Sequence, residues 1–138
     1  MKFKLQLFFL SLMLLFISCR QEIVPPDNPA GNINEPQLTR TNFSYIFSIN
    51  ANKITENVVD NTFLNTSRSR IYPVINDHSS GSVEIIVQAD QDNVLYSAVF
   101  DSDTNGSFTE IEGQQPRVII FNFSDFTGKL KVTLTDIE

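Results

Sequence analysis

The sequence predicts an all-β fold, built as a single antiparallel β-sandwich. Several short segments alternate apolar and polar residues with a period of two, which is typical of half-buried strands. Clusters of Asn, Asp, Ser and Gly separate these segments about every ten residues, as in sandwich domains. No helical segment long enough to connect parallel strands interrupts the series. These observations favour strands joined by short turns around one core.

The first eighteen residues have the composition of a cleaved signal. Two lysines precede an apolar run over residues 5–17. As a helix this run would be about 20 Å long, which is short of the ~30 Å hydrocarbon core of a bilayer. It is therefore typical of a signal-peptide apolar region and not of a membrane span. The small residue Ser18 then precedes Cys19, the only cysteine of the chain.

The end of this segment reads Leu15-Phe16-Ile17-Ser18-Cys19. It resembles the lipobox of bacterial lipoproteins, although Phe16 stands where these motifs usually carry leucine. The resemblance covers residues 1–19 and implies cleavage before Cys19. It also implies a diacylglyceryl group on the Cys19 sulfur and a third acyl chain, such as palmitate, on its freed amine. Two or more acyl chains hold a protein stably on a membrane.

The resemblance also implies a location. Arg20 follows the cysteine, and aspartate at this place tends to retain lipoproteins in the inner membrane. We therefore expect a lipid anchor in the outer membrane, with the domain facing the periplasm or the cell surface. The alternative is a plain secretory signal that ends near an unrelated cysteine.

Residues 19–37 are predicted to form a flexible spacer. Four of the six prolines fall between Arg20 and Gln37, and the longest apolar run there is Ile23-Val24. Such a composition cannot bury enough surface to offset the entropy of ordering. As polyproline II, the spacer would reach about 55 Å. The alternative is that these residues pack as an N-terminal edge of the domain, which is expected to span residues 38–138.

The strands of this domain are predicted in chain order. Three segments alternate clearly, and their apolar faces are Phe43, Tyr45, Phe47 and Ile49, then Val83, Ile85, Val87 and Ala89, then Leu130, Val132 and Leu134. Residues 117–123 are apolar on both faces, as expected of a central strand. Further strands are predicted at 72–75, 94–100 and 108–111, whereas 54–63 fits a strand or a short helical turn.

Two kinds of strand connection fit this series. An immunoglobulin-like or fibronectin-like Greek key is the first expectation, and a small barrel or a jelly roll is the alternative. The chain has no tryptophan and no second cysteine, so the resemblance to immunoglobulin domains is one of architecture only. The core must then be built on phenylalanine and tyrosine.

One segment matches a calcium-binding pattern. Asp101, Asp103, Asn105 and Glu112 occupy ligand positions of an EF-hand loop, and the Ser107 carbonyl would be a fifth ligand. Ca²⁺ is therefore a candidate cofactor beside the covalent lipid.

The context of this segment favours another structure. Residues 94–100 are rich in β-branched and aromatic residues, and Gly113 and Pro116 stand where the second EF-hand helix would run. We therefore first expect a hairpin turn at Asn105-Gly106 with solvated acidic residues. Calcium held by a loop between two strands is the alternative.

Charge and composition limit the function. Beyond Ser18 the chain carries eight basic and sixteen acidic residues and no basic patch, which argues against a nucleic-acid partner. His78 is the only histidine and lies in a polar turn, and one histidine with a lipidated cysteine cannot form a zinc site. The sequence contains no catalytic constellation, so we do not expect an enzyme.

We therefore expect a membrane-anchored, non-catalytic binding or accessory module of the cell envelope, with a protein or glycan ligand. Core packing is the first expectation for most of Tyr45, Tyr72 and Tyr96, and stacking of an exposed ring on a glycan is the alternative. Two other functions stay open. One is a structural subunit of a surface assembly that works through strand pairing. The other is a calcium-dependent adhesive module.

Overall fold

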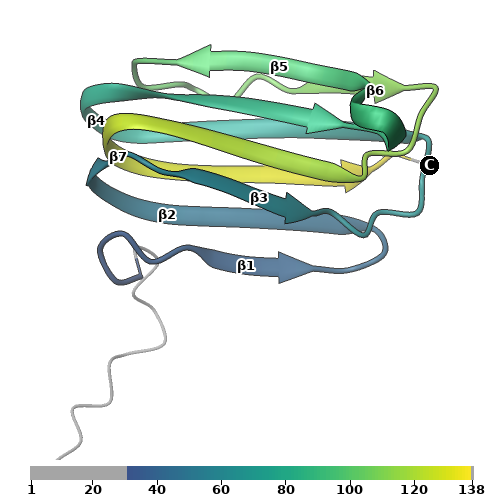
Figure 1. Ribbon diagram of the computed structural model, residues 1–138, viewed down its shortest axis with the longest axis horizontal. Coiled ribbons are helices and arrows are strands. Elements are labelled where there is room, and N and C mark those ends of the chain that lie inside the picture. Colours follow the sequence, from purple (N-terminus) through teal and green to yellow (C-terminus); the bar gives the residue numbers. More distant parts are fainter. Residues whose placement is uncertain (1–30, 138) are drawn as a thin grey trace, which may run out of the picture.

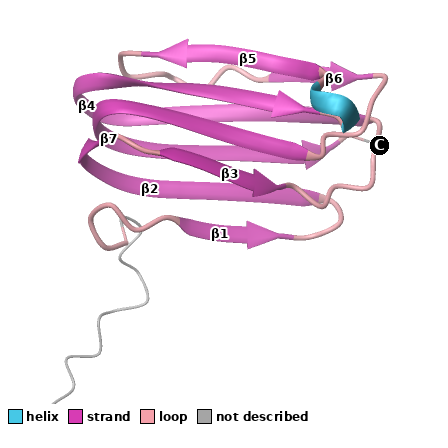
Figure 2. Ribbon diagram, viewed as in Figure 1, coloured by secondary structure: helices cyan, strands magenta, loops and turns pink. Residues whose placement is uncertain are grey.

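The computed structural model describes residues 31–137, so the predicted signal, Cys19 and most of the predicted spacer lie outside the described residues. The described residues form seven strands and one short 3₁₀ turn (Figures 1 and 2). The elements are β1 (Gln37–Arg40), β2 (Ser44–Ile54), β3 (Asn57–Asn61), β4 (Arg68–Gln88), the turn η1 (Asp90–Asp92), β5 (Val94–Phe100), β6 (Thr109–Glu112) and β7 (Val118–Asp136). Between residues 31 and 137, no helix is both long and apolar enough to cross a bilayer.

The strands form two layers, and the long strands β4 and β7 each contribute one half to each layer (Figure 1). In the first layer, residues 68–76 of β4 lie between β6 and residues 129–136 of β7, and β2 and then β1 follow on the far side of β7. In the second layer, residues 82–88 of β4 lie between β5 and residues 118–124 of β7, and β3 pairs with β7. All of these pairings are antiparallel.

The predicted all-β antiparallel sandwich is therefore confirmed. The order β2, β7, β4, β6 in one layer and β3, β7, β4, β5 in the other is that of a jelly roll with β1 added at one edge. The strand order thus follows the jelly-roll alternative and not the order of immunoglobulin domains. The physical reason is that β4 and β7 pair on both sides of their bends and fold over together, which places their two halves in different layers.

Two bends carry β4 and β7 from one layer to the other. The bend of β4 contains Asp77 and Gly81, with φ of 55° and 71°, and the bend of β7 contains Asp125, with φ of 49°. Both bends contain the Asp, Ser and Gly residues that are typical of turns. Ser80 still pairs with Thr127 between them, so the two bends stay in contact.

The core lies between the layers and is built on aromatic rings, as the composition predicts. Phe47 of the first layer stacks on Phe121 of the second with ring centroids 4.0 Å apart and an interplanar angle of 20°. The predicted apolar faces are buried over Tyr45, Phe47, Ile49, Val83, Ile85, Val87, Ala89, Leu130, Val132 and Leu134. Alternation in the sequence therefore identified these inward faces correctly.

Phe43 is the exception among the predicted core residues, because its side chain is 69% exposed. The strand β2 begins only at Ser44, after a turn in which the Ser44 amide donates to Thr41 Oγ1 at 2.9 Å. The turn takes Phe43 out of the strand, so its position in the alternating pattern no longer determines the direction of its side chain.

Residues 32–36, assigned by the sequence to the spacer, lie against the end of β2. The Asn34 amide donates to the Asn50 carbonyl at 2.8 Å, and the Asn52 amide donates to Asn34 Oδ1 at 2.7 Å. Residues 32–36, at the end of the predicted spacer, therefore pack on the domain. The chain enters the domain at the end of the sandwich where β2 finishes (Figure 1).

Candidate functional site

The predicted calcium segment crosses between the two layers. β5 pairs with residues 83–88 of β4, whereas β6 pairs with residues 68–71, so the intervening residues do not form the expected β5–β6 hairpin. The Thr104 amide donates to the Ile75 carbonyl at 3.0 Å, and the Ile75 amide donates to Thr104 Oγ1 at 3.0 Å. These two bonds hold the crossing segment against β4.

The structure does not gather the five predicted calcium ligands into one site. Asp103 Oδ1 accepts a hydrogen bond from the His78 amide at 2.8 Å, and Glu112 forms an ion pair with Arg68 at 3.2 Å. The other three residues, Asp101, Asn105 and Ser107, are exposed. Among residues 31–137, no three Asp, Glu, His or Cys side chains are grouped to hold a metal ion. In an EF-hand, the second helix would bring Glu112 back to the calcium loop. Here Glu112 lies instead in the strand β6, at the edge of the first layer.

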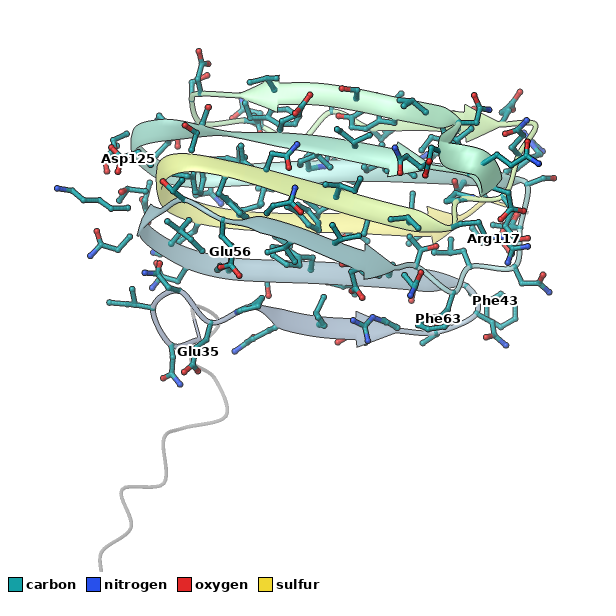
Figure 3. All side chains as sticks on the ribbon, in the orientation of Figure 1. Glu35, Phe43, Glu56, Phe63, Arg117 and Asp125 are labelled. Carbon is teal, nitrogen blue, oxygen red and sulfur yellow. The ribbon has the colours of Figure 1, made fainter. Side chains whose placement is uncertain are left out.

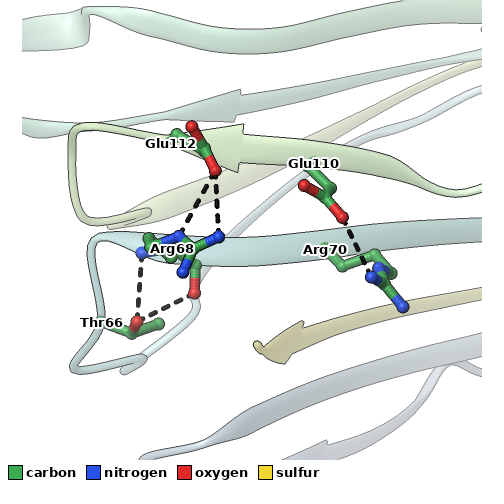
Figure 4. Close-up of polar contacts among 5 residues, drawn as sticks. All are labelled: Thr66, Arg68, Arg70, Glu110 and Glu112. Atoms are coloured by element: carbon green, nitrogen blue, oxygen red, sulfur yellow. Dashed lines mark hydrogen bonds and ion pairs between the residues drawn. The ribbon is translucent and has the colours of Figure 1, made fainter. Parts of the chain in front are cut away.

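The two glutamates of β6 instead pair with arginines directly across the strands (Figure 4). Glu112 lies opposite Arg68, and Glu110 Oε1 lies 3.0 Å from the Arg70 guanidinium. The Arg70 guanidinium also lies over the Phe108 ring, 4.0 Å from its centroid. Pairs this exposed contribute little stability. Their position opposite one another favours the observed register of the short strand β6.

Of the three tyrosines considered for glycan stacking, two face the interior. Tyr45 is fully buried, and burial raises the pKa of the half-buried Tyr96. Only Tyr72 is well exposed, at 39% of its surface. The glycan-stacking hypothesis is therefore limited to Tyr72 among these candidates.

A charged cluster that the sequence analysis missed closes one side of the sandwich. Asp60 of β3 accepts hydrogen bonds from the Arg40 guanidinium, with Nε and Oδ2 3.1 Å apart, and from the Tyr45 hydroxyl at 3.0 Å. Arg40 ends β1 and Tyr45 lies in β2, so the cluster ties the two layers together. The sequence does contain a signal for this cluster. If residues 57–61 form a strand, the charged Asp60 lies on the same face as the apolar Val58. The signal was missed because that segment also fitted a helical turn.

The surroundings of Tyr45 in this cluster raise the pKa of its hydroxyl. Burial raises the pKa of the phenol well above its usual value near 10, and the neighbouring Asp60 carboxylate raises it further. An unfolded chain would lose this proton near pH ~10. The stabilising contribution of Tyr45 is therefore fully present below about pH 10 and is lost as the pH rises towards the folded pKa.

We expect the free energy of unfolding to fall by about 1.4 kcal/mol per pH unit above about pH 10 from this group alone. Tyr45→Phe should remove that contribution, while a contribution of the same sign from Tyr96 persists in both proteins. Urea unfolding of both proteins at several pH values between about 8 and 11.5 measures the difference in slope. Parallel curves above pH ~10 would show that Tyr45 keeps an ordinary pKa in the folded protein.

Two exposed phenylalanines project from adjacent loops at one end of the sandwich. Phe43 is 69% exposed and Phe63 is 62% exposed, and both lie at the same end in Figure 3. The Asn65 amide donates to the Asn42 carbonyl at 3.1 Å, which joins the two loops. We call Phe43, Phe63, Asn42 and Asn65 the loop-end patch.

Phe63 adopts a backbone conformation that bulky residues avoid. Its φ is 57°, in the left-handed region. Both neighbours are buried: Thr62 Oγ1 donates to the Pro116 carbonyl at 2.7 Å, and Leu64 is 1% exposed. These anchored neighbours hold the Phe63 ring outward. The sequence could not identify this residue, because its exposure depends on a backbone angle that residue type does not predict.

The loop-end patch lies opposite the end where the chain enters the domain. In Figure 3, Phe43 and Phe63 are at one end of the sandwich and Glu35 is near the other. The register agrees, because Phe43 precedes the first residue of β2 and Asn34 bonds to Asn50 and Asn52 near its last. The patch therefore lies at the end of the sandwich opposite Asn34 and Glu35.

Comparison of the sequence with protein-family models gives no match, and comparison with curated proteins gives none either. Functional inference for this chain therefore depends on its own residues and geometry.

Proposed function

We propose that the protein is a lipid-anchored, non-catalytic binding or accessory module of the outer membrane, with a protein or glycan as ligand. The lipobox-like residues 15–19 support the anchor, and Arg20 after the cysteine supports the outer membrane as its location. The acidic charge supports a partner other than nucleic acid or anionic lipid.

The observation that carries the proposal is the loop-end patch. Single exposed apolar residues are common on protein surfaces and need no explanation. Here two phenyl rings are exposed on hydrogen-bonded loops, and one of them, Phe63, is held outward at a backbone cost of about 1–2 kcal/mol. Strained residues of this kind cluster at binding sites. Aromatic rings beside amides also provide the contacts that anchor proteins and glycans.

The position of the patch fits an anchored protein. The chain enters the domain beside Asn50 and Asn52, at the end of the sandwich opposite Phe43. An anchor at Cys19 would hold that end towards the membrane and leave the loop-end patch facing outward. A ligand approaching from the side away from the membrane would meet Phe43 and Phe63 first.

The test is capture of a ligand by soluble protein that begins at Arg20. We expect one specific protein from envelope extracts or one glycan class on an array, and we expect Phe43→Ser with Phe63→Ser to reduce its capture at least about tenfold. Truncation of an aromatic anchor typically costs about 2 kcal/mol or more in binding free energy. Because both rings are exposed, the melting temperature should stay within a few degrees.

Phe108→Ser is the matched control. Phe108 is 54% exposed, and its ring lies under Arg70 of β4, a strand that β7 separates from β2 in the first layer. The control should capture the ligand as the wild type does. Equal capture by the wild type and the double variant would exclude the loop-end patch as the binding site.

A further inference from the structure

The free edge of β5 is a second surface with the features of a docking site, and it is separate from the loop-end patch. Within residues 31–137, β5 pairs with β4 alone and ends the second layer. On the open side of an edge strand, alternate N–H and C=O groups point away from the sheet and can pair with another strand.

The other three edge strands are protected against such pairing. β1 has four residues and ends at Arg40, and β3 carries the inward-facing Asp60. β6 also has four residues, and two of them are glutamates. Short length and charged or inward-pointing residues are the usual devices that keep edges from pairing.

β5 has none of these devices. Its seven residues read Val94-Leu95-Tyr96-Ser97-Ala98-Val99-Phe100, without a charge, a proline or a glycine. Val94 and Val99 are 53% and 65% exposed. Leu95, Tyr96 and Phe100 pack against the core but stay only partly buried. A long, apolar and uncharged edge is a site of association in a soluble domain unless a partner covers it.

Charge at the two ends of β5 indicates which partner fits. Asp90 and Asp92 precede the strand, Asp101 and Asp103 follow it, and all four are exposed. If two copies paired antiparallel along β5, the acidic residues before one strand would lie beside those after the other. Like charges so placed repel each other, so a second copy is a poor occupant.

We propose that the β5 edge binds an extended apolar segment of a partner protein, flanked at both ends by lysine or arginine, as an added strand of the second layer. Main-chain hydrogen bonds to β5 would supply affinity, as in other cases of strand addition. The partner's apolar side chains would cover the exposed parts of Tyr96, Val99 and Phe100. Its basic ends would meet the four aspartates. This inference does not depend on the ligand of the loop-end patch.

The probe is a fluorescein-labelled synthetic peptide, Lys-Lys-Val-Thr-Val-Thr-Val-Lys-Lys, titrated against the full mature protein in nanodiscs of zwitterionic lipid. We expect saturable binding by fluorescence anisotropy. A peptide with glutamate in place of the four lysines should bind at least about tenfold more weakly, because two unlike charges become like charges at each end. A peptide N-methylated at alternate residues should also bind at least about tenfold more weakly, since it lacks main-chain donors on one edge.

Two variants locate the site on the protein. Val99→Lys places a charge on the β5 edge and should weaken binding at least about tenfold. Val59→Lys is the matched control, because Val59 is 61% exposed on β3, the opposite edge of the same layer. It introduces the same charge and should change binding less than about twofold. Both variants should retain the wild-type melting temperature within a few degrees, because both side chains are exposed.

Several results would overturn the proposal. One is the absence of saturable binding of the lysine-flanked peptide up to about 1 mM, which corresponds to a free energy of association weaker than about 4 kcal/mol. Another is equal binding of the N-methylated peptide. Equal weakening by Val59→Lys would also do so, because the effect would then be one of net charge. A wild-type dimer that Val99→Lys alone dissociates would show that a second copy occupies the edge. Loss of ligand capture by the Phe43 and Phe63 variant, with peptide binding intact, would leave this inference standing.

Discussion

Gly81→Ala is expected to destabilise the protein by about 3 kcal/mol or more. Gly81 lies in the bend of β4 with φ of 71°, where a side chain costs about 1–2 kcal/mol. A Cβ atom there would also lie 2.3 Å from the Asp125 carbonyl and 2.3 Å from the Ser124 oxygen. Both are backbone atoms of the β7 bend, so the two bends would have to separate. Overpacking of this kind costs a further ~1–3 kcal/mol.

Gly113→Ala provides the matched control. Gly113 also has a positive φ, 93°, but no atom lies within 4 Å of the position that its Cβ would occupy. Its substitution should therefore show only the conformational cost of about 1–2 kcal/mol. Urea unfolding of both variants compares the two free energies. If Gly81→Ala cost no more than Gly113→Ala, the close contact between the β4 and β7 bends would be disproved.

Asp60→Ala is expected to cost about 2 kcal/mol, the second largest effect. The substitution removes the acceptor of the buried Tyr45 hydroxyl and the partner of the partly exposed Arg40 guanidinium. A buried hydroxyl without a partner costs about 1–3 kcal/mol, and the lost ion pair adds less because solvent reaches Arg40. The loss should also loosen β1 and β3, which the cluster joins.

Asp90→Ala separates this effect from the general effect of removing an aspartate. The Asp90 carboxylate lies 3.5 Å from the Arg117 guanidinium, and its side chain is 79% exposed. A surface pair of this kind contributes less than about 0.5 kcal/mol. Thermal and urea unfolding should therefore distinguish the two variants clearly. Equal destabilisation would mean that Asp60 is not part of a buried network.

The inward faces of the strands could be predicted because they depend on local alternation. Val83, Ile85 and Val87 lie two residues apart, and a strand places every second side chain on one side of the sheet. The jelly-roll order could not be predicted in this way. Alternation does not reveal that residues 76–82 and 124–128 bend together and keep β4 paired with β7 through both layers.

The candidate surfaces were less accessible to prediction. The exposure of Phe43 depends on the turn at Thr41, and that of Phe63 depends on a left-handed φ. The open edge of β5 depends on strand order, since the same seven residues in a central strand would be covered on both sides. The EF-hand pattern was visible in the sequence, but the strand β6 places Glu112 beside Arg68 and not beside the other predicted calcium ligands. Each of these outcomes depends on a local backbone conformation or on strand order, neither of which residue alternation determines.

Intact-protein mass spectrometry of the wild type, extracted from membranes with detergent, tests the proposed anchor most directly. We predict a chain that begins at Cys19 and carries the added mass of a diacylglyceryl group and one further acyl chain, with the protein in the outer-membrane fraction. Cys19→Ala should abolish that mass, because it removes the only thiol in the sequence. A chain that still begins at Met1, or one with a free Cys19 thiol that is released without detergent, would contradict the membrane-anchored function proposed for this protein.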